Sequence, residues 1–274
     1  MIVWLASYPK SGNTWVRAFL NAYLHSPEGE FDFSLLDKIE EFPQHDILNK
    51  FMNTKDFHNL KEISKNWIKV QEAINFNKKI TFLKTHSSLC NINGNIFTNK
   101  DNTLVFIYIV RDPRNVTLSM SNHFGNTQGE SLKILTDEKY TIYPVVNNQL
   151  IPATHVSSWK NHYVSWKNCN SINKIIIKYE DLINNSYDTF KKIINFLSKH
   201  AKIKYDKKKL INSIDTTQFE NLKKYEEKHG FHMGQKNKFF HLGKKNDWKS
   251  FLDKKIITEI NTQFKSEMSE LRYI

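Results

Sequence analysis

The sequence contains only two cysteines, Cys90 and Cys169, among its 274 residues. They are too far apart to form a C-x-x-C pair, and neither has the spacing of metal ligands, so a cysteine-based metal site or redox motif is not expected. One disulfide between them is conceivable. Two isolated cysteines are, however, more typical of free thiols in a reducing compartment.

The sequence also lacks an apolar run long enough to cross a membrane. At the N-terminus, apolar residues begin at position 2 without a basic region before them, and Lys10 follows soon after, which is unlike a signal peptide. We therefore expect a soluble cytoplasmic protein with no membrane partner. There are no internal repeats and no low-complexity linker, so the length suits one domain over residues 1–274.

Acidic residues are outnumbered in this chain. Asp and Glu total 28 against 40 Lys and Arg, which gives a formal net charge of +12. Such a balance can attract nucleic acid or an acidic glycan. The lysines are scattered, apart from the block at residues 207–209, so we interpret most of this charge as solvated surface and expect no nucleic-acid partner.

Short apolar runs alternate with amphipathic stretches along the chain. The expected strands are 2–7, 80–84, 104–110 and 174–179. The expected helices are 14–24, 67–76, 113–123, 154–168, 181–200 and 254–264. Residues 104–110 are apolar at nearly every position, as in a strand covered on both faces. The pattern predicts an α/β protein, a three-layer P-loop-type fold with a central parallel β-sheet flanked by helices.

Two long segments, 26–66 and 125–152, show no clear periodicity. The first contains Phe31, Phe33, Phe51 and Phe57, and the second contains Tyr140 and Tyr143, with Phe124 just before it. Segments of this kind often form the walls over a site in α/β enzymes.

The loop from Tyr8 to Trp15 joins the first expected strand to the first expected helix. Backbone N–H groups at a helix start are unpaired and point at one spot, where the helix dipole favours a phosphate. Gly12 permits the turn and lets the backbone approach the anion closely. In the standard P-loop a lysine follows the second glycine. Here Asn13 holds that position and Lys10 lies upstream, so we expect an anion held without metal rather than Mg-ATP.

A histidine follows the second expected strand in Lys84-Thr85-His86. Side chains at the carboxyl ends of parallel strands line the ligand crevice. Because imidazole titrates near neutrality, His86 could remove a proton from an acceptor hydroxyl. A lone histidine at a strand end is also a common turn cap, so this role depends on the neighbouring motifs.

The third expected strand is followed by Arg111-Asp112-Pro113. Pro113 fits the first turn of a helix, and Asp112 fits its cap. Arg111 offers a planar fork of donors suited to phosphate, and Ser119 offers a hydroxyl one to two turns into the helix. The alternative is a structural ion pair between Arg111 and Asp112.

Taken together, these motifs resemble those of the PAPS-dependent sulfotransferases, where PAPS is 3′-phosphoadenosine-5′-phosphosulfate. The loop is similar to the family's Y-P-K-[SA]-G-[TN]-T-W, residues 84–86 to its K-T-H, and residues 111–119 to its R-[DN]-P-[RK]-x-x-x-x-S. Residues 179–182 resemble Y-E-D-L, and residues 217–222 resemble T-S-F-E-x-[ML]. The motifs follow the family's order from residue 2 to about residue 251.

The resemblance implies transfer of a sulfuryl group from PAPS to a hydroxyl or amine of a small-molecule or carbohydrate acceptor, giving PAP without a metal. It implies catalytic roles for His86 as general base, Lys10 on the leaving phosphate, Lys84 on the sulfuryl oxygens, and Ser119. The implied nucleotide-binding residues are Lys10, Ser11, Gly12, Asn13, Thr14, Trp15, Arg111, Ser119, Tyr179, Thr217, Phe219, Gly243, Lys244 and Lys245.

Within that set, the resemblance implies more specific positions for the nucleotide. Arg111 and Ser119 would hold the 3′-phosphate, and Trp15 and Phe219 would sandwich the adenine. The last motif departs from the family's F-x-R-K-G-x-x-G-D-W, because His241 and Leu242 replace its Arg and Lys. Lys244 and Lys245, next to Gly243, are the candidates to replace those cations. The family's C-terminal dimerisation pattern is not recognisable, so we predict no such dimer.

Two other functions fit parts of the sequence. A P-loop kinase for a small molecule is disfavoured by the positions of Lys10 and Asn13. A non-catalytic polyanion binder agrees with the net charge but has no need for Lys10, His86 and Ser119 together. The acceptor itself is not identified, since the aromatic residues of segments 26–66 and 125–152 suit an apolar alcohol. The lysines of the first segment would equally suit an acidic glycan; they are Lys38, Lys50 and Lys55.

Overall fold

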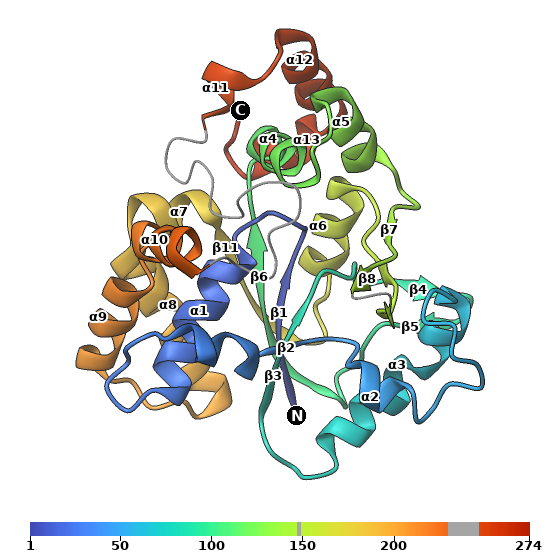
Figure 1. The fold of residues 1–274 in the computed structure, drawn as a ribbon, viewed down its shortest axis with the longest axis vertical. Helices are drawn as coiled ribbons and strands as arrows, with labels where there is room; N and C mark the ends of the chain where they lie inside the picture. Colours follow the sequence, from blue (N-terminus) through green and yellow to red (C-terminus); the bar gives the residue numbers. More distant parts are fainter. Residues whose placement is uncertain (147–148, 230–246) are drawn as a thin grey trace.

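Five parallel strands form the central sheet in the order β11-β6-β1-β3-β2 (Figure 1). The strands are β1 (Ile2–Ser7), β2 (Glu40–Glu41), β3 (Thr81–Thr85), β6 (Thr103–Val110) and β11 (Asn173–Lys178). This structure is a computed structural model, and it describes residues 1–146, 149–229 and 247–274. The four longer strands confirm those expected from the sequence, and their ends differ by one residue at most.

Successive side chains of the four longer strands enter two separate cores. Trp4 and Phe106 pack into the core on one face of the sheet, whereas Leu5 and Ile107 pack into the core on the other. All four side chains are fully buried. Because neighbouring residues of a strand point to opposite faces, runs that are apolar throughout require cover on both sides.

Helices provide that cover and complete three layers. The Leu5 face packs against α1 (Asn13–His25), α7 (Tyr179–Asn184), α8 (Ser186–Ala201) and α9 (Lys207–Thr216). The Trp4 face packs against α3 (Leu60–Asn75), α4 (Pro113–Phe124), α5 (Gln128–Thr136), α6 (Trp159–Lys167), α12 (Lys254–Gln263) and α13 (Lys265–Glu270). In Figure 1, α1, α8 and α9 lie to the left of the sheet and α3 and α6 to its right. This arrangement confirms the expected P-loop-type α/β fold.

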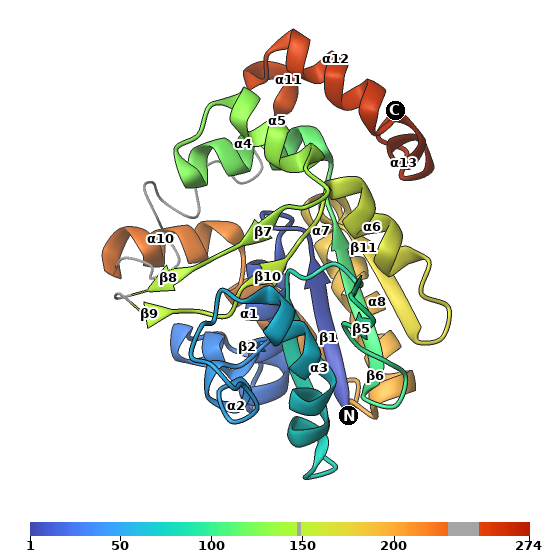
Figure 2. The ribbon, with the colours of Figure 1, turned by 90° about the vertical axis from the view of Figure 1, so that its right-hand side faces the viewer.

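Shorter elements occupy the connections. They are the 3₁₀ helix η1 (Phe33–Lys38), the helices α2 (His45–Leu48), α10 (Phe219–His229) and α11 (Trp248–Phe251), and the antiparallel pairs β4 (Asn91–Ile92) with β5 (Asn95–Ile96), β7 (Thr141–Ile142) with β10 (Thr154–His155), and β8 (Val145–Val146) with β9 (Gln149–Leu150). Figure 2 shows α4, α5, α11, α12 and α13 gathered beyond the carboxyl ends of the strands.

Three expected helices differ from those observed. The helix expected over 67–76 begins earlier, at Leu60, where the Asn59 side chain accepts from the N–H of Glu62 and caps α3. The helix expected from Thr154 begins only at Trp159, because Thr154 pairs with Ile142 in a β-ribbon and the Ser158 hydroxyl caps the helix instead. The helix expected over 181–200 is two helices, α7 and α8. They meet at Asn185, whose side chain accepts from the N–H of Asp188 and starts the second helix.

The structure also bears on disulfides and membrane spans. Cys90 and Cys169 form no disulfide, as the sequence indicated. Among the helices of the described ranges, none combines the length and the apolar character needed to cross a bilayer.

Candidate active site

A cavity of about 1470 Å³ lies at the carboxyl ends of the central strands. This is the edge of a parallel sheet where ligands bind. The cavity brings together most of the site residues expected from the sequence. Those that line it are Lys10, Gly12, Asn13, Thr14, Trp15, Lys84, His86, Arg111, Ser119, Tyr179 and Phe219.

The other expected site residues are placed differently. Ser11 is fully buried behind the loop and does not line the cavity. Thr217, at the end of α9, is also fully buried and donates its hydroxyl to the Ser213 carbonyl over 2.5 Å. Gly243, Lys244 and Lys245 lie outside the described residues.

The first loop leaves a helix start open toward the cavity. Gly12 is the N-cap of α1 with φ 98°, and no side chain caps the helix. A Cβ on Gly12 would lie 2.3 Å from the Tyr179 ring, so only glycine fits between that ring and the turn. Lys10 also has a positive φ of 65°, an uncommon value for a residue with a side chain. The uncapped N–H groups favour an anion at this position.

Asn13, which replaces the P-loop lysine, holds the loop to the sheet. Its amide nitrogen donates to the Leu5 carbonyl over 3.2 Å and to the Ser7 hydroxyl over 3.1 Å. The side chain thus points toward β1 and is buried. Its contribution to an anion site is therefore its backbone N–H, at the first position of α1.

Arg111 connects the loop to the end of β6. Its Nη1 donates to the Lys10 carbonyl over 2.9 Å, and its Cζ lies 4.3 Å from the centre of the Tyr179 ring. The guanidinium is buried, yet its Nε has no hydrogen-bond partner among the described residues. A buried donor of this kind is costly unless a ligand accepts from it.

The ammonium group of Lys10 lies in the same positively charged region. Burial and, next, the charge of Arg111 lower the pKa of Lys10 to about 7, although Glu226 acts in the opposite direction. An anion bound beside both cations would relieve their repulsion and raise that pKa.

One contact orients the ring of His86, and a second holds its backbone. Its Nδ1 lies 2.8 Å from the Ser7 carbonyl, to which it can donate, and this leaves Nε2 without a partner among the described residues. On the other side, the buried His162 donates from Nε2 to the His86 carbonyl over 3.1 Å and accepts from Tyr108 Oη at Nδ1 over 2.8 Å. Neutral His86 therefore presents Nε2 as a proton acceptor.

Burial and, next, the charge of Lys84 lower the pKa of His86 to about 3. The imidazole is consequently neutral at physiological pH. Glu41 opposes this shift, and a bound anion would do so further, because both favour the protonated ring.

Lys84 forms an ion pair that the sequence did not indicate. Its Nζ lies 2.9 Å from Glu41 Oε2, and Glu41 belongs to the edge strand β2. Burial acts to raise the pKa of Glu41, but the charges of Lys84 and Arg17 outweigh it, and the net pKa is lowered. No signal singles out Glu41, because it lies in a segment without periodicity.

Aromatic side chains line the opposite part of the cavity. Trp15 and Phe219 both reach it and share a small apolar cluster with Leu222. The Trp15 ring meets the Tyr179 ring edge-on, with 6.1 Å between centroids. Its Nε1 is buried and has no partner among the described residues. A flat base with hydrogen-bond acceptors suits such surroundings.

The remaining walls come from segments 26–66 and 125–152 and from nearby residues of α4 and α11, and they are largely apolar. Their apolar members are Phe42, Pro43, Ile47, Leu118, Phe124, Ile142, Pro144, Val145, Ile151, Pro152 and Phe251. Of the aromatic residues expected there, Phe124 lines the cavity, whereas the other six do not; they are Phe31, Phe33, Phe51, Phe57, Tyr140 and Tyr143. Lys38, Lys50 and Lys55 do not, whereas Asp37, Glu40, Glu41 and Asp46 do. In the described ranges, no three His, Cys, Asp or Glu side chains gather as a metal site.

The chain is similar to known proteins over nearly its whole length. Residues 2–272 match the model of the sulfotransferase domain. The chain is 25% identical over 272 residues to flavonol 3-sulfotransferase of Flaveria bidentis, and the match covers 94% of this chain and 79% of that protein. It is 23% identical over 222 residues to luciferin sulfotransferase of Photinus pyralis, covering 80% of this chain and 56% of that protein.

Solved structures with the same fold include two that contain PAP. A mouse sulfotransferase complexed with PAP has a TM-score of 0.63 and 20% identity, and the match covers 98% of this chain and 84% of that one. Retinol dehydratase in complex with androsterone and PAP has a TM-score of 0.61 and 14% identity, with 97% and 80% covered.

Proposed function

The chain belongs to the sulfotransferase family, and we propose that it transfers a sulfuryl group from PAPS to a hydroxyl or amine of a small molecule, releasing PAP. One observation carries this proposal. Lys10, His86 and Arg111 come from the ends of three different strands and line one cavity, where each suits a different step of that reaction.

Such a donor carries two phosphate groups, and different residues of the cavity would hold each of them. The uncapped start of α1 and Lys10 would hold the 5′-phosphosulfate, and Arg111 with Ser119 would hold the 3′-phosphate. The adenine would lie against Trp15 and Phe219. The unpartnered Nε of Arg111 and Nε1 of Trp15, both among the described residues, support this assignment.

The transfer needs a proton acceptor on one side of the sulfur and a cation on the other. PAPS supplies an activated sulfuryl group, whose bond to the phosphate oxygen breaks as a bond to the acceptor oxygen forms. His86 Nε2 would take the acceptor's proton, and Lys10 would stabilise the charge that develops on the leaving phosphate. Lys84, paired with Glu41 in this structure, would move to the sulfuryl oxygens.

The walls favour an apolar acceptor over an acidic glycan. They present apolar side chains and carboxylates, and within the described ranges segments 26–66 and 125–152 contribute no lysine or arginine to them. A polyanionic chain would find little to neutralise its charge there. A compact alcohol or phenol would instead bury its apolar surface.

Sulfuryl transfer is tested by incubating the protein with ³⁵S-labelled PAPS and a panel of apolar alcohols and phenols. We expect labelled product and PAP in equal amounts. The His86→Ala variant should bind PAP while producing neither. Phosphorylation of the panel with Mg-ATP, in place of sulfuryl transfer, would contradict the proposal and favour a kinase.

A further inference from the structure

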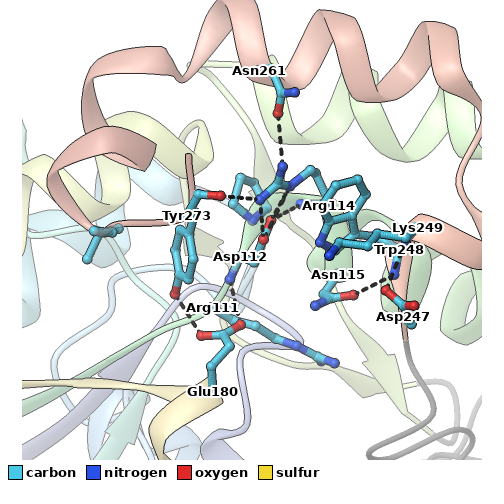
Figure 3. Close-up of polar contacts among 12 residues, drawn as sticks. Arg111, Asp112, Arg114, Asn115, Glu180, Asp247, Trp248, Lys249, Asn261 and Tyr273 are labelled. Carbon is cyan, nitrogen blue, oxygen red and sulfur yellow. Dashed lines mark hydrogen bonds and ion pairs between the residues drawn. The ribbon is translucent and has the colours of Figure 1, made fainter.

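Figure 3 shows Tyr273, near the end of the chain, beside Glu180 and Asp112. At this place β6 passes into α4 at residues 111–112 and β11 passes into α7 at residues 178–180. These two strand–helix junctions carry Arg111 and Tyr179, which line the cavity. Tyr273 Oη donates to Glu180 Oε2 over 2.8 Å, and Glu180 Oε1 accepts from the backbone N–H of Asp112 over 3.0 Å. Asp112 directly follows Arg111, and Glu180 directly follows Tyr179. One carboxylate therefore joins the two strand–helix junctions, and the hydroxyl of Tyr273 holds that carboxylate.

Further contacts attach the same C-terminal segment to both strand–helix junctions. Arg114 Nη2 donates to the Tyr273 carbonyl over 2.8 Å and pairs with Asp112 Oδ2 over 2.7 Å. At the junction of β11 and α7, Lys178 Nζ donates to the Leu271 carbonyl over 2.6 Å and lies 4.4 Å from the centre of the Tyr273 ring. The tail thus braces the ends of β6 and β11 together.

This bracing is rigid at the junction of β6 and α4. Asp112 and Arg114 are both buried, and their ion pair is bidentate: Arg114 Nε donates to Asp112 Oδ1 over 2.9 Å and Nη2 donates to Oδ2 over 2.7 Å. Buried, hydrogen-bonded charges of this kind hold one geometry, because any displacement leaves a charge unpaired. On the cavity side, the guanidinium of Arg111 lies over the Tyr179 ring. The spacing of the two strand–helix junctions therefore sets the position of both side chains.

We propose that Tyr273 is a positioning residue for the donor nucleotide. Its bond to Glu180 fixes the distance between the two strand–helix junctions and thereby orients the Arg111 guanidinium toward the 3′-phosphate. The inference rests on the proposed function, because it concerns the affinity of the same nucleotide site. It adds that the C-terminal tail, which does not line the cavity, controls how well the 3′-phosphate is bound.

Tyr273→Phe tests this inference because it removes only the hydroxyl. The dissociation constants for PAP and for AMP, which lacks the 3′-phosphate, are measured by isothermal titration calorimetry together with the melting temperature. Since a hydrogen bond to a charged group is lost and donor geometry is sensitive to small displacements, we expect PAP to bind about tenfold more weakly and AMP to change less than about twofold.

Tyr163→Phe is the matched control. Its hydroxyl donates to Glu270 Oε1 over 3.3 Å, a bond of the same chemistry to the same C-terminal segment. This bond does not involve either strand–helix junction. This variant should leave both dissociation constants unchanged. Glu180→Gln, which keeps the size and one acceptor oxygen, is a second test and should weaken PAP more than AMP.

Three results would overturn the inference. They are an unchanged affinity of Tyr273→Phe for PAP, an equal weakening of PAP and AMP, and an equal effect of Tyr163→Phe. A wild-type protein that binds no PAP would overturn the proposed function, and this inference would fall with it.

Discussion

The guanidinium of Arg111 donates to the carbonyl oxygen of Lys10 over 2.9 Å and so joins the first loop to the end of β6. The bond holds two cationic side chains in one part of the cavity, although their charges repel. Lys10, whose carbonyl accepts this bond, has a left-handed backbone conformation with φ 65°. Uncommon backbone geometry and two like charges held in one cavity are typical of sites prepared for a ligand.

Lys10 should make nucleotide affinity depend on pH. Its pKa, lowered to about 7 by burial and by Arg111, means that Lys10 in the empty site is half neutral at pH 7 and has lost nearly all of its charge by pH 9. PAP favours the charged form, so its dissociation constant should rise across this range, by up to about tenfold per pH unit. Calorimetric titration at pH 7, 8 and 9 measures this. Lys10→Met should bind more weakly with little pH dependence, and a flat wild-type profile would contradict the assignment.

His86 should be needed for turnover rather than for nucleotide binding. Its Nε2 is the available proton acceptor, and removal of a general base costs about 10²- to 10⁴-fold in rate. His86→Ala should show this loss in steady-state turnover, while its dissociation constant for PAP stays within about threefold of wild type. Near-normal turnover would show that another group takes the proton.

Gly12 and Gly94 form a matched pair for testing the loop. Both have positive φ, 98° and 87°, but a Cβ on Gly94 meets nothing within 4 Å, whereas one on Gly12 meets the Tyr179 ring. Alanine in this backbone conformation costs about 1 kcal/mol or more, so Gly94→Ala should lose about that much stability in urea unfolding. Gly12→Ala should lose more and should also weaken PAP binding. Equal losses with unchanged PAP affinity would contradict the close packing of Gly12.

Acid should destabilise the fold before most carboxylates titrate. Burial lowers the pKa of His86 and His162 to about 3 and that of His123 to about 4. Below pH 6.5 the unfolded chain therefore binds protons that the native protein does not. The free energy of unfolding should fall with pH, by up to about 1.4 kcal/mol per pH unit for each histidine.

Urea unfolding between pH 7 and 5 measures that dependence. His162→Gln, which does not titrate, should show a shallower slope than wild type, by the share of one histidine. Stability that stays constant or rises as the pH falls from 7 to 5 would contradict the burial of neutral imidazoles.

Local signals in the sequence predicted the part of the site that lies close to the strands. Residues 2–6 are apolar throughout and residues 104–110 at nearly every position. Gly12 and Pro113 mark the turns that follow, so the strand ends and helix starts could be inferred. The structure brings Lys10, His86 and Arg111 together because parallel strands end at one edge.

The remaining features of the site and the fold depend on contacts that leave no local pattern in the sequence. Glu41 meets Lys84 only because a two-residue strand pairs at the edge of the sheet. Tyr273 reaches Glu180 from 93 residues away in the chain. A helix is expected from Thr154, but Thr154 pairs with Ile142 in a β-ribbon instead. Tertiary pairing of this kind cannot be inferred from one sequence.

The most direct test of a donor with two phosphates is a comparison of PAP and AMP binding to wild type and to Arg111→Ala. If Arg111 binds the 3′-phosphate, wild type should bind PAP at least about tenfold more tightly than AMP, and the variant should bind both with similar affinity. A wild-type protein that binds PAP no better than AMP, or an Arg111→Ala variant that keeps the full preference, would contradict this account.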